Sequence, residues 1–213
     1  MKNSNLKRWL NPFFTELDEI IGHPKSLLDI GCGVNTPLSN LSIRPDYLVG
    51  VDGYQPSIDE SRSKGLHDDY VNTDLLEIDS AFESNTFEAV VALDVIEHFD
   101  KPDGMALLNK MESIASHKVV IFTPNGFQPQ NEHSGNKLQR HLSGWEVEEM
   151  HQLGYQVIGV NGWKPLLGEF ALPRFKPTKL WTLFSRFTQP LVRNHPQHAY
   201  AILCVKDVSN SKI

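Results

Sequence analysis

Two groups of residues at the ends of apolar runs have types and spacing suited to chemistry. The first is the segment Leu27–Gly33, in which an apolar run ends in a glycine-containing turn. The second is Asp52, which lies 21 residues after Gly31 at the end of the next apolar run. Glycine lets a ligand approach the backbone closely. An acid at the tip of the following strand can bind both hydroxyls of a ribose. The pair therefore predicts a site for a nucleoside-containing cofactor.

Further polar residues follow later apolar runs. Asp74 comes shortly after the run Tyr70–Asn72, and the segment Asp94–His98 follows the run Glu88–Leu93. His98 is the best candidate for a general base, because an imidazole titrates near neutral pH. A polar loop at residues 123–142 holds two further candidates for acceptor contacts, His141 and Asn125, and loops of this length are usually functional or disordered.

Short apolar runs alternate with helix-like segments along the chain. The expected strands are Ser26–Ile30, Tyr47–Val51, Tyr70–Asn72, Glu88–Leu93, Lys118–Phe122, Tyr155–Val160 and Tyr200–Lys206. This alternation predicts a doubly wound α/β fold, whose mostly parallel sheet is covered by helices on both faces. Ligands bind such sheets at the carboxyl ends of the strands, so we expect the polar residues to form one composite site.

Helix signals fall between these strands. The expected helices are the N-terminal segment at residues 1–21, Pro56–Lys64 and Pro102–Ala115. Asp100 is the candidate N-cap of the last one. The run Ser143–Glu146 is interpreted as a capping box that opens a further helix ending near Gly154, and Trp145 within it is expected to be a packing residue.

Taken together, these segments resemble a known family. The motifs are Leu-Leu-Asp-Ile-Gly-Cys-Gly33, Val-Gly-Val-Asp52, Asp74-Leu-Leu-Glu, Phe87–His98 and Ser143-Gly-Trp. In this order they are similar to class I S-adenosylmethionine-dependent methyltransferases of the small-molecule type, over roughly residues 22–160, with the last strand resuming near residue 198. The resemblance implies S-adenosylmethionine as cofactor. It also implies a Rossmann-like, doubly wound, seven-stranded, mostly parallel sheet with an antiparallel last strand.

The resemblance assigns roles at the first turn. In such proteins the turn Gly31–Gly33, which contains Cys32, lies under the methionine half of the cofactor, and Asp29 helps to orient its ammonium group, directly or through water. The family usually has a further glycine where this chain has Asn35, a residue type that tolerates left-handed backbone better than most.

Further cofactor contacts are implied at the next strand ends. Asp52 corresponds to the acid that holds both ribose hydroxyls. Asp74 corresponds to the residue that accepts a hydrogen bond from the adenine amino group, beside the backbone N–H of Leu75, although an aspartate at this position also suits a helix cap. Asp94 is expected near the methionine end.

The histidines allow two interpretations. The resemblance extends to methyltransferases in which a Glu-His pair sometimes binds a divalent ion, which would use Glu97, His98, His133 and His141. That spacing is not a recognised ligand pattern. We therefore assign no metal ligand and expect His98 and His141 to be catalytic.

One segment differs from the rest of the chain, and we call residues 163–197 the insertion segment. It contains six basic residues and one acid, so its net charge is +5, whereas the whole chain carries −6 and the remainder −11. Within it, residues 178–188 are predicted to form a basic amphipathic helix that exposes Leu180, Trp181, Phe184 and Phe187. Three interpretations stay open: an acceptor-binding lid, a contact with a membrane surface, or a dimer contact.

Composition limits the function classes. The net charge of −6 argues against non-specific binding of nucleic acid, and we expect no nucleic-acid partner. The two cysteines allow neither a disulfide framework nor a metal spacing, and no apolar run has transmembrane length. The N-terminal residues contain no signal-peptide core. We therefore expect a cytoplasmic protein, with weak peripheral membrane contact through the insertion segment as an option.

The expected organisation has four parts: an N-terminal helical segment (1–21), the cofactor-binding core (22–162), the insertion segment and a last strand with tail (198–213). The expected function is O-methyl or N-methyl transfer to a small-molecule, glycan or lipid-linked acceptor. The alternatives are a nicotinamide-dependent oxidoreductase, against which the missing third glycine of Gly31–Gly33 argues, and a catalytically silent methyltransferase-like binding subunit.

Overall fold

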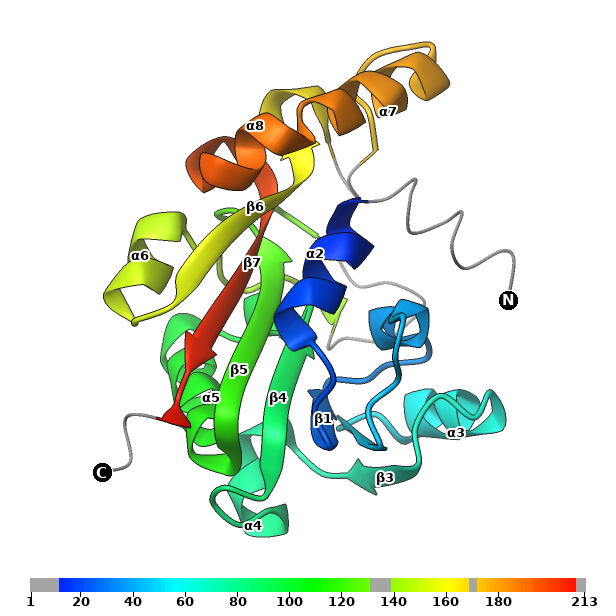
Figure 1. The fold of residues 1–213 in the computed structure, drawn as a ribbon, viewed down its shortest axis with the longest axis vertical. Coiled ribbons are helices and arrows are strands. Elements are labelled where there is room, and N and C mark those ends of the chain that lie inside the picture. Colours follow the sequence, from blue (N-terminus) through cyan, green and yellow to red (C-terminus); the bar gives the residue numbers. More distant parts are fainter. Residues whose placement is uncertain (1–11, 131–138, 169–171, 210–213) are drawn as a thin grey trace.

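The computed structural model describes residues 12–130, 139–168 and 172–209. The first half of the expected N-terminal helical segment lies outside these ranges, as do His133 and Phe170. Within them, the chain forms a sheet flanked by helices (Figure 1).

Seven strands form one sheet in the order β3-β2-β1-β4-β5-β7-β6. They are β1 (Ser26–Ile30), β2 (Tyr47–Asp52), β3 (Asp69–Asn72), β4 (Phe87–Leu93), β5 (Ala115–Pro124), β6 (Gln156–Trp163) and β7 (Ala199–Asp207). The first five pair in parallel, and β7 is antiparallel to both β5 and β6. This confirms the predicted Rossmann-like, mostly parallel sheet with an antiparallel last strand.

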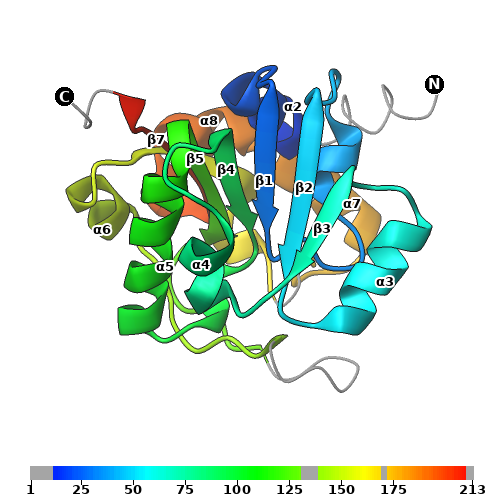
Figure 2. The same cartoon turned by 90° about the horizontal axis from the view of Figure 1, so that it is seen from below.

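The strand order reverses beside β1. The chain proceeds outward from β1 through β2 to β3, then returns to β4 on the other side of β1. Figure 2 shows β1, β2 and β3 running side by side in the same direction. The turns after β1 and β4 are therefore neighbours at the carboxyl edge, which is the topological switch point where ligands bind in open α/β sheets.

Helix α5 (Lys101–Ile114) covers one face of the sheet. Leu107, Met111 and Ile114 are buried in one cluster with the side chains of β4 and β5. The Asp100 side chain accepts a hydrogen bond from the Asp103 N–H at 3.0 Å, which confirms the predicted N-cap. Two short helices lie on the same cluster, α4 (Ile78–Ala81) and α6 (Val147–Gln152).

Helix α2 (Pro12–Ile21) covers the opposite face. Leu17 and Ile21 are buried there, and the Phe13 ring lies 4.5 Å from the Phe122 ring of β5. Helix α3 (Gln55–Ser63) packs on β2 and β3 at the other side of the molecule. Short 3₁₀ turns complete the connections at Pro37–Asn40, Leu75–Glu77, Ile96–His98, Lys164–Leu166 and Pro196–His198.

The insertion segment contains helices α7 (Thr178–Phe187) and α8 (Gln189–Asn194). Because β7 is antiparallel to both neighbours, β6 runs parallel to β5. The segment therefore leaves β6 and enters β7 at the carboxyl edge that also carries the switch point. No helix in the described ranges is both long and apolar enough to cross a membrane.

The helix start at residue 147 differs from the prediction. Glu146, not Ser143, is the N-cap of α6, and it forms the capping box with Glu149. Ser143 instead accepts a hydrogen bond from the Trp145 Nε1–H at 3.1 Å. The N-cap thus lies three residues after the predicted one, because the side chain of Trp145 is buried in the core before the helix begins.

Trp145 connects this segment to the turn after β4. Its side chain is fully buried, and its Nε1–H also donates to the Ile96 carbonyl at 3.3 Å. Gly104 of α5 makes room for the ring, because a Cβ there would lie 2.6 Å from Trp145 Cζ2. Trp145 is thus a packing residue, as expected, and holds the segment Ile96–His98 in place.

We predict that Trp145→Ala lowers the free energy of unfolding by about 3–5 kcal/mol, because it removes a large buried side chain and leaves a cavity. Trp163→Ala is the control, since that side chain is 40% exposed and its loss should cost less than about 1 kcal/mol. Urea denaturation of the two variants measures both values. Similar losses would show that Trp145 is not central to the core.

Candidate functional site

The turn after β1 requires glycine for two reasons. Gly31 and Gly33 have φ values of +67° and +55°, a region that favours glycine. A Cβ on Gly31 would lie 2.6 Å from Cγ2 of Val95, in the turn after β4. The absence of a side chain therefore lets the two turns of the switch point touch.

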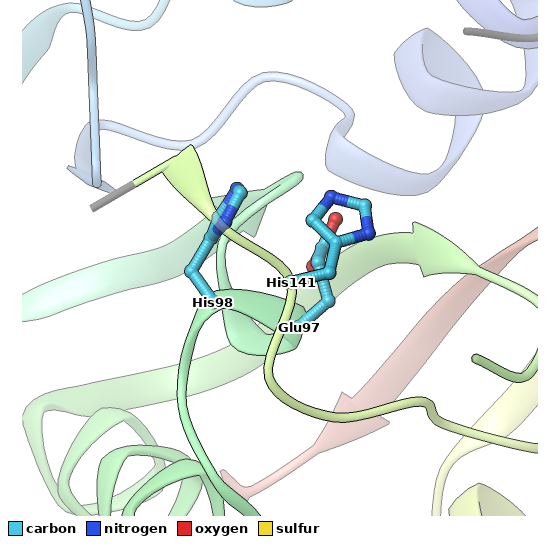
Figure 3. A group of neighbouring side chains, drawn as sticks. All are labelled: Glu97, His98 and His141. Atoms are coloured by element: carbon cyan, nitrogen blue, oxygen red, sulfur yellow. The ribbon is translucent and has the colours of Figure 1, made fainter. Parts of the chain in front are cut away.

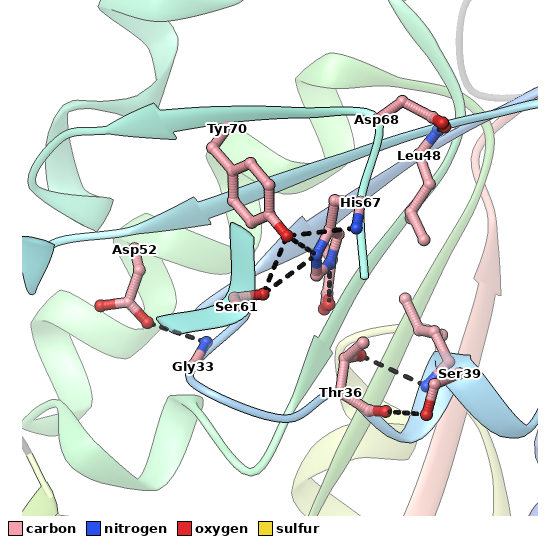
Figure 4. A network of polar contacts seen from close by, with 11 residues as sticks. Gly33, Thr36, Ser39, Leu48, Asp52, Ser61, His67, Asp68 and Tyr70 are labelled. Atoms are coloured by element: carbon pink, nitrogen blue, oxygen red, sulfur yellow. Dashed lines mark hydrogen bonds and ion pairs between the residues drawn. The ribbon is translucent and has the colours of Figure 1, made fainter. Parts of the chain in front are cut away.

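Asp52 connects this turn to the end of β2. Its Oδ2 accepts a hydrogen bond from the Gly33 N–H at 3.0 Å (Figure 4). Its Oδ1 accepts one from the Tyr54 N–H at 2.8 Å. Burial raises the pKa of the carboxyl, although these two bonds act in the opposite direction. Each oxygen keeps a lone pair for a further donor.

Asp29 and Cys32 lie beneath the turn instead of in the cavity. The Asp29 carboxylate pairs with His67 Nε2 at 2.9 Å, and both side chains are buried. The hydroxyl of Tyr70 accepts the His67 N–H at 3.2 Å and lies 3.0 Å from Ser61 Oγ, which completes the network in Figure 4. Burial raises the pKa of the Cys32 thiol far above its usual range. The structure thus gives Asp29 a protein partner where an ammonium contact was expected.

A cavity of about 680 Å³ opens at the switch point, within the range typical of small-molecule sites. It brings together seven of the predicted site residues: Gly31, Gly33, Asp52, Asp74, Leu75, Asp94 and His98. Sequence reasoning missed other lining residues, which are Val34, Gly53, Tyr54, Pro56, Ser57, Glu60, Val95, Phe99 and Gln139. Four of the nine, Val34, Gly53, Val95 and Phe99, directly follow a predicted residue, so their place in the chain was an available signal, but Glu60 and Gln139 had none.

Two predicted residues next to the cavity have structural partners of their own. Asp74 Oδ1 accepts the Leu76 N–H at 2.9 Å, so this aspartate does cap the 3₁₀ turn while it also lines the cavity. Asn35 is not in the left-handed region. Its side chain accepts a hydrogen bond from Lys64 Nζ at 2.9 Å, and the same amine binds the Val34 carbonyl, which anchors the loop to α3.

Asp94 lines the cavity, and its carboxyl group interacts with that of Glu97, which is buried behind the lining. Asp94 has φ +58°, and strain of this kind in a non-glycine residue is common at functional sites. Desolvation raises the pKa of both carboxyls, and the charge of Asp94 raises that of Glu97 further. Glu97 Oε2 accepts the Thr123 hydroxyl at 3.0 Å.

His98 and His141 are brought together, although 43 positions separate them. Their ring centroids are 4.9 Å apart, beside Glu97 (Figure 3). His98 Nδ1 lies 3.1 Å from the Arg140 carbonyl, and His141 Nδ1 lies 2.7 Å from the Gln128 carbonyl. Desolvation lowers the pKa of both imidazoles, which favours the neutral forms.

The ends of the loop at residues 123–142 are held by backbone contacts. The Leu142 and Ser143 N–H groups both donate to the Glu97 carbonyl, at 2.8 and 3.1 Å. Asn125, expected to contact the acceptor, instead donates its side-chain amide to the carbonyls of Pro196 and Ala199. That expectation was wrong, because the amide fastens the loop to the chain entering β7.

Comparisons with known proteins agree with this geometry. Residues 28–117 match the family model for the methyltransferase domain. A comparison of the sequence with curated proteins finds no match. The family match argues against the oxidoreductase alternative and confirms the resemblance described above.

Solved structures show the same fold at low sequence identity. An S-adenosylmethionine-dependent methyltransferase from Archaeoglobus fulgidus has 18% identity and a TM-score of 0.53, covering 95% of this chain and 91% of that chain. A chain from the complex of the Haloferax volcanii Trm112 methyltransferase activator with the putative methyltransferase has 14% identity, a TM-score of 0.59 and coverages of 97% and 92%. Magnesium protoporphyrin IX methyltransferase from Synechocystis PCC 6803, with bound S-adenosylhomocysteine, has 13% identity, a TM-score of 0.52 and coverages of 94% and 82%.

We predict that Gly31→Ala costs more stability than Gly22→Ala. The two glycines have φ of +67° and +66°, but a Cβ on Gly22 has no neighbour within 4 Å. The left-handed backbone should cost about 1–2 kcal/mol at each site, and the clash with Val95 should add about 1–3 kcal/mol at Gly31. Chemical denaturation measures the difference. Equal losses would mean that the two turns separate freely.

Proposed function

We propose that the chain is an S-adenosylmethionine-dependent methyltransferase that transfers the methyl group to a hydroxyl of an amphiphilic acceptor held at an anionic membrane surface; the match to the methyltransferase family model and the shared fold support the methyl transfer. One observation carries the transfer chemistry: a single cavity reaches from Asp52 at the ribose position to His98. A second observation, the exposed apolar and basic face of the insertion segment, favours the membrane-associated acceptor.

The proposed cofactor position follows the lining of the cavity. The ribose hydroxyls donate to the free lone pairs of Asp52, whose oxygens are already oriented by Gly33 and Tyr54. The adenine lies toward Asp74 and Leu75, and the methionine half crosses the turn Gly31–Gly33 toward Asp94. The two glycines leave space for this crossing, because neither has a side chain at the surface of the cavity.

The proposed reaction uses His98 as proton acceptor. The sulfonium of the cofactor makes its methyl group electrophilic. The acceptor oxygen forms the new O–CH₃ bond while the S–CH₃ bond breaks, the hydroxyl proton passes to neutral His98, and S-adenosylhomocysteine leaves. The lowered pKa of His98 supports this role, because an imidazole must be neutral to accept a proton. An amine acceptor would fit the same geometry.

Helix α7 presents an apolar face to solvent. Leu180, Leu183, Phe184 and Phe187 are all at least half exposed, and Phe187 reaches 74%. Leu191 of the following helix α8 is also exposed, at 63%. An amphipathic helix with large apolar and basic residues is typical of proteins that lie on membrane surfaces.

The charge around α7 favours an anionic surface. Lys176, Lys179 and Arg186 lie in or beside the helix, and the insertion segment has a net charge of +5 against −11 for the remainder. An anionic bilayer would attract the segment and repel the rest of the molecule. Because the segment starts at the carboxyl edge of the sheet, where the cavity also opens, such binding would bring the cavity close to the membrane.

We predict that Asp52→Ala weakens S-adenosylmethionine binding by about 1–3 kcal/mol, or roughly 5- to 150-fold, because two ribose hydroxyls lose their acceptor. Asp69→Ala is the control, since Asp69 is exposed at the start of β3 and does not line the cavity. Calorimetric titration of both folded variants gives the affinities. Unchanged affinity in Asp52→Ala would assign the ribose to another residue.

The transfer itself is tested with isotopically labelled cofactor and a cell extract separated into membrane and aqueous fractions. Mass spectrometry should find the labelled methyl on an oxygen of a membrane-fraction product, and S-adenosylhomocysteine should accumulate. Label confined to the aqueous fraction would overturn the membrane part of the proposal. Cofactor binding without S-adenosylhomocysteine from either fraction would favour a silent binding subunit.

We predict salt-sensitive sedimentation of the protein with anionic vesicles. Lys176→Glu combined with Lys179→Glu should weaken binding at low salt at least about 30-fold, since each basic residue near such a surface is worth about 1 kcal/mol. The control pair Lys25→Glu and Arg62→Glu makes the same charge change at exposed positions outside the insertion segment. Equal effects of the two pairs, or no sedimentation of the unmodified protein, would contradict surface binding through α7.

A further inference from the structure

Three side chains beyond the cofactor position form a compact group of donor atoms. Glu97, His98 and His141 each offer one ligand atom, and these atoms all lie within 4.8 Å of one another (Figure 3). Two of the residues belong to the 3₁₀ turn after β4, and the third comes from the returning end of the loop at residues 123–142. The sequence spacing did not indicate a metal site, because the loop brings His141 back over the turn.

Glu97 supplies an independent observation that favours a cation at this place. Its residue is 1% exposed, no N–H or hydroxyl group among the described residues donates to Oε1, and the carboxyl group that interacts with it is that of Asp94. Its other oxygen is engaged with the Thr123 hydroxyl. A buried carboxylate oxygen without a partner is costly, and a cation bound at this place would remove that cost.

Both histidines are oriented as metal ligands usually are. Each places Nδ1 against a backbone carbonyl, that of Arg140 for His98 and that of Gln128 for His141. A donor at Nδ1 leaves the lone pair on Nε2, the nitrogen available to a metal. Carbonyl partners of this kind fix the tautomer and ring orientation of metal-bound histidines.

We propose that Glu97, His98 and His141 bind a divalent transition-metal ion, such as Mn²⁺, Co²⁺ or Zn²⁺. Two imidazoles and one carboxylate suit these ions better than Mg²⁺ or Ca²⁺, which prefer oxygen ligands. Three protein ligands leave coordination positions open for water or an acceptor. His98 also lines the cavity, so the open positions lie beside the proposed path of the methyl group.

The functional consequence rests on the proposed O-methyl transfer. An ion at this place would bind the acceptor hydroxyl and lower its pKa, which favours attack on the methyl group. In that state the Nε2 lone pair of His98 is given to the ion, so His98 is a ligand and the proton leaves to solvent. His98 cannot be the proton acceptor and a metal ligand at the same time, and the rate of methyl transfer before and after chelation shows which role it has.

Metal binding is tested first without the reaction. The protein is treated with chelator, dialysed and titrated with MnCl₂ and with ZnCl₂ by calorimetry, and we expect one ion per chain. Glu97→Gln and His141→Ala should each weaken binding at least about 100-fold, a loss at the upper end of that seen for partners of metal ligands. His117→Ala, at an exposed histidine on β5, is the matched control and should bind normally. Titration with S-adenosylmethionine shows that each variant is folded.

The outcomes distinguish this inference from the proposed function. Absence of an ion, or equal binding by Glu97→Gln, His141→Ala and His117→Ala, would overturn the metal site. Methyl transfer at an unchanged rate after chelation would overturn its catalytic role and leave O-methyl transfer with His98 as base. Stoichiometric, variant-sensitive ion binding in a protein that transfers no methyl group would support the site and refute the function.

Discussion

The contact between Gly31 and Val95 is the constraint on which the site depends. It joins the turn after β1 to the turn after β4, and a side chain at Gly31 would lie 2.6 Å from Val95. Because these turns touch, Asp52 from β2 can accept the Gly33 N–H on one side while Asp94 and His98 follow Val95 on the other. The proposed positions of the cofactor and of the acceptor thus lie in one cavity, at the edge where the parallel strands present their carboxyl ends together.

Three buried polar side chains near the site, those of Asp29, Asn125 and Glu97, differ in their hydrogen bonding. Asp29 pairs with His67, and the side-chain amide N–H groups of Asn125 donate to backbone carbonyls. These contacts stabilise the turn and the loop, and the residue types alone did not reveal them. Glu97 differs, because its carbonyl anchors the loop while one carboxylate oxygen has no partner among the described residues. An unsatisfied buried group in an otherwise well-bonded region points to chemistry more strongly than its residue type does.

The insertion segment combines two properties that separate it from the core. Phe175, Phe184 and Phe187 are among its exposed side chains, and its charge opposes that of the remainder. Trp181, which was expected to be exposed, is instead half-buried against the core cluster, and Leu166 and Leu167 are buried. Neither property stabilises the fold. Lys164 nevertheless binds the Asn125 carbonyl at the end of β5, so the start of the segment is fastened to the edge that carries the cavity. This short connection therefore joins the proposed surface contact to the edge of the sheet that carries the cavity.

The sheet, its seven strands, the Asp100 cap and seven of the sixteen residues that line the cavity followed from the sequence alone, because apolar periodicity and glycine turns act over a few neighbouring residues. The sequence did not reveal the partners of Ser143, Asp29 and Asn125. These side chains bind residues 38 to 74 positions away, such as His67 for Asp29 and Ala199 for Asn125. Only the tertiary structure placed His141 beside Glu97 and His98, because that contact depends on how the loop folds back onto the turn after β4. Local rules determine where strands and turns occur, whereas which buried polar groups satisfy one another is decided when the elements pack.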